Sequence, residues 1–145
     1  MLLLGVAKKI VLVFSVGLIA CTFAQAVCSV DVVLVRGRVD NAPGKAKVHV
    51  QLLYPKGRAG ESGDVAIENG TFSIPIEFLT QSRRPAVNGM LEKCNRRPSA
   101  VIVTLVENNG CHEYDRVTLN FSKDFRLADP TAYALRSELV LKGSR

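Results

Sequence analysis

GDVAIENGTFSIPIEF, residues 63–78, is the stretch that decides the fold, because its apolar residues occupy alternate positions on both sides of an Asn-Gly pair. Alternation with a period of two is typical of a strand that buries one face. Asn-Gly favours the two-residue turn of a tight β-hairpin. We therefore predict a type I′ turn at Asn69 and Gly70, with Glu68 opposite Thr71.

Extending this register predicts how the rest of the hairpin pairs. Ile67 lies opposite Phe72 and Val65 lies opposite Ile74, so that the large apolar side chains share one face. Proline has no N–H to donate to a sheet. Pro75 falls opposite Asp64 in this register, so we expect the pairing to end or bulge there and to leave a sheet edge.

Other β-branched and aliphatic runs recur along the chain with turn residues between them. They are VDVVLVRGRV (30–39), KVHVQLLY (47–54), SAVIVTLVE (99–107), CHEYDRVTLNF (111–121) and SELVLKG (137–143). Alternation puts Val48, Val50 and Leu52 on one face, with His49 and Gln51 on the polar face, and puts Leu139 and Leu141 on one side. The runs 99–107 and 111–121, on either side of Asn109-Gly110, predict a second hairpin. Residues 55–63 are expected to be a polar loop, 79–100 a long irregular stretch with a helical turn near 90–93, and 122–134 a connection. About seven strands without a long helix predict an all-β fold, a two-layer antiparallel β-sandwich.

The first 26 residues have the pattern of an export leader. Lys8 and Lys9 precede an eleven-residue apolar run, residues 10–20, and Ala24-Gln25-Ala26 offers small residues to a signal peptidase. We predict a signal peptide over residues 1–26, cleaved after Ala26, and one secreted or periplasmic domain over 27–145. An alternative stays open, because residues 18–21 also fit a lipoprotein box that would leave a lipid anchor on Cys21.

Length and charge narrow the classes of partner. The apolar run is shorter than the roughly 20 residues that cross a bilayer as a helix, so the mature chain is expected to have no transmembrane segment. Without the leader, 17 Lys and Arg stand against 13 Asp and Glu, a net charge of +4. Both signs are interspersed, whereas nucleic-acid binding proteins concentrate positive charge on one element. We expect no nucleic-acid partner.

The mature chain has three cysteines, Cys28, Cys94 and Cys111. An oxidising compartment favours disulfides, and an odd number leaves one thiol over. Cys94 and Cys111 flank the same predicted strand pair and form the preferred disulfide, although spacing does not determine connectivity and the fate of Cys28 stays open. There is no Cys-x-x-Cys or Cys/His cluster, so neither a structural zinc nor another cofactor is expected.

Two Arg-Arg-Pro triplets stand out in the long irregular stretch. Arg83, Arg84, Arg96 and Arg97, with Lys93 between the pairs, are candidate ligands for phosphate, sulfate or carboxylate groups on a partner. The competing interpretation is a solvated loop whose charges protect a sheet edge from aggregation. Both interpretations stay open.

VRGRVDNAPGKAKVHVQL (35–52) followed by GDVAIENGTFSIPI (63–76) resembles the prealbumin-like domains, which include transthyretin-like proteins and carboxypeptidase regulatory-like domains. The resemblance covers residues 32–76 and implies a β-sandwich. It also implies a non-catalytic module for protein, carbohydrate or envelope interaction, whose partner here would be an unidentified protein or polysaccharide.

One branch of that group, the hydroxyisourate hydrolases, is catalytic. Its histidines, arginine and C-terminal Tyr-Arg-Gly-Ser are matched here only by His49, His112 and an ending that lacks the Tyr-Arg portion. We therefore expect no enzyme. A small exported hydrolase is the alternative, and it requires His49 and His112 to converge with an arginine in one pocket.

Overall fold

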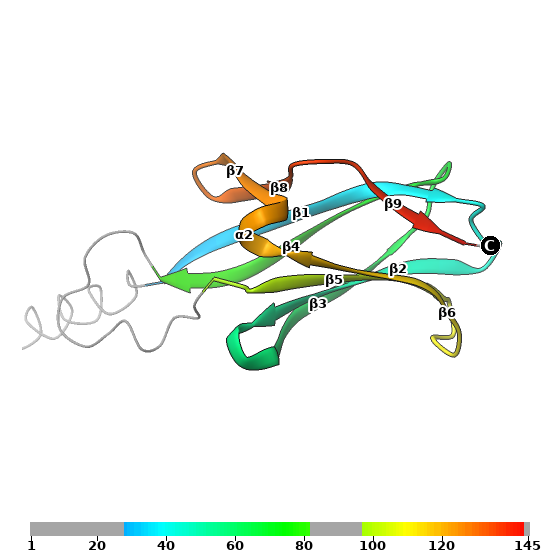
Figure 1. Cartoon of the computed structure of the whole chain (residues 1–145), viewed down its shortest axis with the longest axis horizontal. Helices are drawn as coiled ribbons and strands as arrows, with labels where there is room; N and C mark the ends of the chain where they lie inside the picture. Colours follow the sequence, from blue (N-terminus) through cyan, green and yellow to red (C-terminus); the bar gives the residue numbers. More distant parts are fainter. Residues whose placement is uncertain (1–27, 82–96, 144–145) are drawn as a thin grey trace, which may run out of the picture.

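The computed structural model describes residues 28–81 and 97–143, which form two β-sheets around a shared apolar core (Figure 1). The β1 sheet contains β4 (Thr71–Gln81), β1 (Cys28–Asp40), β8 (Ala132–Leu135) and β7 (Phe125–Asp129) in this spatial order, with β9 (Leu139–Lys142) also paired to β1. The β2 sheet contains β3 (Arg58–Ala66), β2 (Ala46–Tyr54), β5 (Ala100–Glu107) and β6 (Glu113–Asn120). The prediction of an all-β fold is confirmed.

The described residues contain nine strands, and the prediction of about seven was too low. The two additional strands, β7 and β8, form from the segment 122–134 that was predicted to be a connection. They are five and four residues long, too short for period-two alternation to stand out. A one-turn helix, α2 (Phe121–Asp124), precedes them, and a short η1 (Pro55–Gly57) lies between β2 and β3. β3 itself begins inside the predicted polar loop.

The expectation of purely antiparallel sheets is wrong for the β1 sheet. Strands β8 and β9 both run parallel to β1, along successive parts of the same edge. The β2 sheet is antiparallel throughout, and its β5–β6 pair confirms the second predicted hairpin. Parallel pairing needs a long crossover, which here is supplied by the passage of the chain through the other sheet.

The turn at Asn69 and Gly70 is as predicted. Glu68 and Thr71 exchange backbone hydrogen bonds of 2.9 and 3.0 Å, and both turn residues have positive φ, 53° and 73°. Positive φ at both central positions is the requirement of a type I′ turn.

Beyond the turn, the predicted pairing of Ile67 with Phe72 and of Val65 with Ile74 is wrong. β3 pairs with β2, and β4 pairs with β1, so the turn joins two different sheets. Phe72 and Ile74 are buried, and Val65 and Ile67 pack partly buried against the same core. Alternation indicates which side chains are buried but not which strands pair. Two strands in facing sheets bury the same set of side chains as the two strands of one hairpin do.

Pro75 was predicted to lie opposite Asp64, and it lies opposite Leu34 of β1 instead. The predicted edge exists nevertheless, because β4 is an outer strand of the β1 sheet. Val39 N–H donates to the Gly70 carbonyl at 2.7 Å, so in this register the even-numbered residues of β4 exchange hydrogen bonds with β1. Pro75 is one of the odd-numbered residues of β4, whose backbone N–H and C=O groups point away from β1. Its missing N–H therefore removes no hydrogen bond between β4 and β1.

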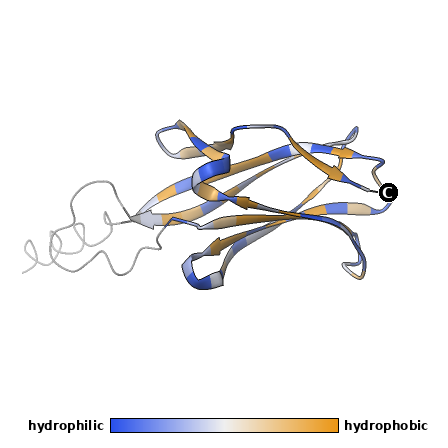
Figure 2. Cartoon of the chain, in the orientation of Figure 1, coloured by the Kyte–Doolittle hydropathy of each residue, from blue (hydrophilic) through white to orange (hydrophobic). Residues whose placement is uncertain are grey.

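The core confirms the predicted burial of alternate residues. Val48, Val50 and Leu52 of β2 are buried on one face, and Leu139 and Leu141 of β9 are buried opposite them in the β1 sheet. Hydrophobic residues concentrate along the strands, while η1 and α2 are largely hydrophilic (Figure 2). Each fully buried aliphatic or aromatic side chain contributes about 1.5–3 kcal/mol to stability.

In the part of the chain that the structure describes, no helix has the length and apolar character needed to cross a membrane.

Candidate functional site: an arginine-lined groove

A groove of about 900 Å³ opens on the β1 sheet where β1 loses its partner on one side. β8 pairs with β1 as far as Ala134 opposite Leu34, and β9 begins to pair only at Leu139 opposite Gly37. Residues 135–138, which run from the last residue of β8 to the start of β9 and are called the link here, form one wall. Pockets of this volume are of the size that holds small ligands or a segment of a partner.

Charged side chains line this groove, which we call the arginine groove. Its charged members are Arg36 and Arg38 from β1, Arg126 from β7, Arg136 and Glu138 from the link, and Glu68 from the turn before β4. Thr71, Ser73 and Ser137 add hydroxyl groups. Four guanidinium groups against two carboxylates give the groove a net positive charge, which favours an anionic ligand.

Two of the four arginines are held by other protein groups. Arg38 Nη1 lies 3.1 Å from both carboxylate oxygens of Glu138, and its Nε lies 3.2 Å from Asp40 Oδ1. The hydrogen bond to Asp40 and the charge of Glu138 raise the pKa of Arg38. Arg136 Nε donates to the Phe125 carbonyl at 3.1 Å. These two side chains build the wall of the groove, and the charge of Arg38 is partly neutralised by Glu138 and Asp40.

The other two arginines are available to a ligand. Within residues 28–81 and 97–143, no ion pair or hydrogen bond engages the guanidinium groups of Arg36 and Arg126. Both residues lie on the outer face of the β1 sheet, the face directed away from the core. Arg126 is opposite Ala134, which is opposite Leu34, two residues before Arg36. Strand spacings put their Cα atoms about 12 Å apart, so that two extended side chains can meet at one anion.

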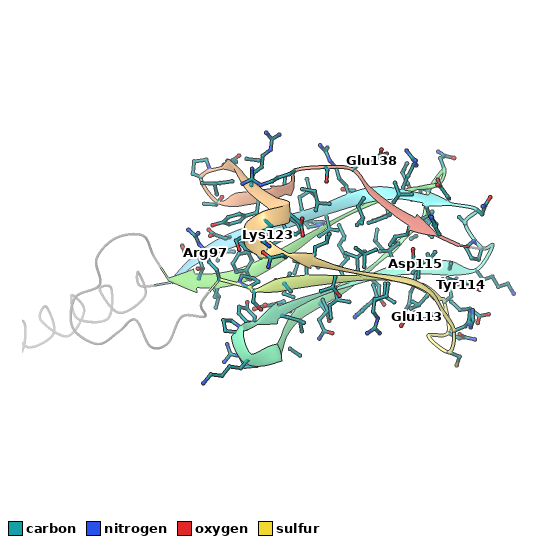
Figure 3. The ribbon with its side chains drawn as sticks, in the orientation of Figure 1. Arg97, Glu113, Tyr114, Asp115, Lys123 and Glu138 are labelled. Atoms are coloured by element: carbon teal, nitrogen blue, oxygen red, sulfur yellow. The ribbon has the colours of Figure 1, made fainter. Side chains whose placement is uncertain are left out.

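Of the predicted anion-binding residues, only Arg97 can be placed. Arg83, Arg84, Lys93 and Arg96 lie outside the described residues. Arg97 is exposed, with its guanidinium carbon 5.8 Å from the centre of the Tyr133 ring, and it does not line the arginine groove. Figure 3 shows it at the end of the molecule opposite Glu113 and Tyr114. The prediction about the Arg-Arg-Pro loop therefore stays a prediction.

Only one cysteine of the predicted Cys94–Cys111 disulfide lies among the described residues. Cys111 has a free, exposed thiol in the β5–β6 turn, and Cys94 lies outside the described residues. The pairing of Cys94 with Cys111 therefore stays a prediction.

The two histidines have separate surroundings. His49 is on the outer face of the β2 sheet, as predicted, and its Nδ1 lies 2.5 Å from Asp64 Oδ1. The His112 ring packs edge-on against the Tyr114 ring, with centres 4.6 Å apart. Neither residue lines the arginine groove. Among the described residues, no three His, Cys, Asp or Glu side chains are grouped so as to hold a metal ion.

Asp64 is the centre of a polar cluster on the outer face of the β2 sheet. Lys47 Nζ lies 2.7 Å from Asp64 Oδ2, and His49 holds the other carboxylate oxygen. Hydrogen bonds from Lys47 and then from His49 lower the pKa of the Asp64 carboxyl group below its ordinary value. A lowered carboxyl pKa stabilises the fold above the unfolded-state pKa, and this stabilisation is lost as the pH falls through the native pKa.

The Asp64→Asn variant is accordingly expected to lose stability relative to the parent protein at neutral pH, with the difference shrinking as the pH falls through the lowered pKa of Asp64. Because the carboxylate is 44% exposed, the loss should stay below about 1 kcal/mol. Urea denaturation at a series of pH values measures it. Glu77→Gln, which removes a β4 carboxylate outside every described ion pair, is the control and should leave the pH profile unchanged. A parallel profile for Asp64→Asn would contradict the assigned cluster.

The sequence contained one signal for the arginine groove that its analysis did not use. Arg36 and Arg38 stand two apart in a predicted strand, a spacing that places both on its polar face. Arg126 and Arg136 gave no such signal, because they lie in or beside a segment predicted to be a connection. Only the pairing of β7 with β8, and of β8 with β1, brings them to the groove.

Comparisons with protein-family models, with curated proteins and with solved structures found no match to the chain.

Proposed function

We propose that this chain is an exported, non-catalytic β-sandwich module of prealbumin-like type that binds an anionic partner in the arginine groove. Its ligands are the carboxylate, sulfate or phosphate groups of an acidic protein, a polysaccharide or another component of the cell envelope. Export rests on the leader pattern of residues 1–26, and the family rests on the residue pattern of 32–76. The two facing sheets with one apolar core support the sandwich.

One observation carries the binding proposal: Arg36 and Arg126, whose guanidinium groups have no partner among the described residues, share a groove with two arginines that are held in place. Arginine binds carboxylate, sulfate and phosphate bidentately, and such charge-assisted bonds are about twice as strong as neutral ones. The held pair, Arg38 and Arg136, shapes the wall and adds positive potential. The free pair supplies the contacts.

The double variant Arg36→Ser/Arg126→Ser tests this. We expect its affinity for heparin, a sulfated polysaccharide, to fall by at least about tenfold for each guanidinium that binds directly. The affinity of the parent protein should itself decrease as salt is added, because the groove is open to screening ions. Isothermal titration at two salt concentrations measures both effects.

The matched control is Lys45→Ser/Arg116→Ser, which removes the same charge from exposed positions outside the arginine groove. It should weaken heparin binding only slightly, through net charge. Equal losses in the two double variants would show that heparin responds to overall charge, and the groove would then not be the binding site.

A further inference from the structure

The outer face of the β1 sheet has an apolar half beside the arginine groove. Its members come from three adjacent strands: Val30, Val32 and Leu34 of β1, Pro75 and Leu79 of β4, and Ala132 and Ala134 of β8. Val30 and Leu79 are opposite each other, and they are 49% and 48% exposed. Monomeric soluble proteins rarely expose contiguous apolar patches without a partner.

The apolar half and the cationic half are continuous. Leu34 is followed on the same face of β1 by Arg36, and Ala134 is opposite both Leu34 and Arg126. Glu77 is the acidic residue that β4 directs to this face. A single surface therefore has exposed aliphatic side chains at one end and, at the other, guanidinium groups that no described residue engages.

We infer that this face docks on a membrane surface that contains anionic lipids, so that lipid phosphate groups are the anions that the arginine groove binds. This inference rests on the proposed function. Arg36 and Arg126 bind headgroup phosphates, while Val30 and Leu79 enter the boundary between headgroups and acyl chains. Basic residues beside exposed aliphatic ones are the combination that holds proteins at anionic interfaces, where charge attraction and apolar burial add.

Two other occupants fit this face less well. A second copy related by two-fold symmetry would set its Arg36 and Arg126 against either the same cationic half or the apolar half. Like charges in an interface and unpaired charges buried against apolar side chains both oppose association. A strand added to the free edge of β4 would meet Pro75, whose backbone nitrogen points outward and has no hydrogen to donate. Charge complementarity thus favours an anionic surface.

The test measures co-sedimentation of the exported protein with vesicles, after intact mass has shown a chain without a lipid on Cys21. We expect strong binding to vesicles of equal parts phosphatidylcholine and phosphatidylglycerol and weak binding to phosphatidylcholine alone. Arg36→Ser/Arg126→Ser should lower binding to the mixed vesicles by about tenfold or more. Leu79→Ser should also lower it severalfold while leaving heparin affinity unchanged.

Leu127→Ser is the matched apolar control. Leu127 of β7 is 43% exposed. It pairs with the buried Tyr133, so its side chain is on the core-facing side of the sheet and not in the apolar half of the outer face. This variant should bind mixed vesicles as the parent does, and equal unfolding midpoints show that all variants are folded.

Three further outcomes would distinguish failure of the lipid inference from failure of the proposed function. Heparin binding that depends on Arg36 and Arg126, without binding to mixed vesicles, would overturn the lipid inference and leave the proposed function standing. Loss of neither ligand in the arginine variant would overturn both. Binding of poly-glutamate that Leu79→Ser abolishes, again without vesicle binding, would overturn the lipid inference in favour of an acidic protein partner.

Discussion

Replacement of Phe78 by alanine is expected to lower the free energy of unfolding by about 3–5 kcal/mol, the cost of removing a large aromatic side chain from a core. Phe78 is 2% exposed and lies between the two sheets. Its ring meets Phe121 edge-on with centres 6.2 Å apart, and it contacts Tyr133 at 6.3 Å. The truncation therefore leaves a cavity among rings that cannot collapse easily.

The neighbouring Leu79 gives the matched control. It occupies the next position of β4 and is directed to the outer face. Leu79→Ala should cost less than about 1 kcal/mol. Urea denaturation of the two variants compares them directly. Similar losses would contradict the inward and outward alternation on which both the core and the apolar half of the outer face depend.

Gly37→Ala is the second substitution with a large expected effect. A Cβ at this position would overlap the carbonyl oxygen of Leu139, because β9 pairs directly with β1 there. Backbone atoms cannot rotate away as a side chain can, so β9 must shift from β1. We expect a loss of at least about 1–3 kcal/mol, the usual cost of overpacking.

Gly37→Ala should loosen β9 locally as well as lower the free energy of unfolding of the whole domain. Hydrogen exchange of the β9 amides, Leu139–Lys142, should speed up more than that of β2. Among the described strands β9 pairs only with β1, and its Lys142 N–H donates to Asp115 Oδ2 of β6 at 2.8 Å, whereas β2 pairs with a strand on each side. Gly44→Ala is the control, since a Cβ there meets no atom within 4 Å. Unchanged exchange in β9 would mean that the strand tolerates the added methyl group.

Gly37→Ala also tests how the arginine groove is built. The link 135–138 is anchored where β9 begins, so a shifted β9 moves Glu138 away from Arg38. Glu138 lies on the outer side of the β1 sheet in Figure 3. A heparin affinity that changes in this variant, without any change in charge, would indicate that the geometry of the groove matters and not only its arginines.

The burial of several residues and one turn were predicted correctly from the sequence. Phe72, Ile74, Val48 and Val50 were predicted to be buried, and they are, because the identity of a side chain and a period of two suffice to choose a face. The turn at Asn69 and Gly70 was predicted correctly for a local reason as well: positive φ at two successive residues favours this pair.

The pairing of strands, unlike their buried faces, could not be predicted from the alternation of side chains. The backbone groups that join strands are the same in every residue, so alternation in residues 63–78 was equally compatible with one hairpin and with a turn between two sheets. The Asp64–His49 contact was missed for this reason, since it follows from the pairing of β3 with β2.

The sequence by itself therefore determined the all-β class, the buried faces of strands such as β2 and β4, and the tight turn, because these depend on side chains close together in the chain. Only the tertiary structure decided which strands share each sheet, the parallel pairing of β8 and β9 with β1, and the groove that brings Arg36 beside Arg126. These depend on pairing between separate segments, such as Val32 with Ala132 and Gly37 with Leu139, and local patterns carry no information about which strand becomes the neighbour.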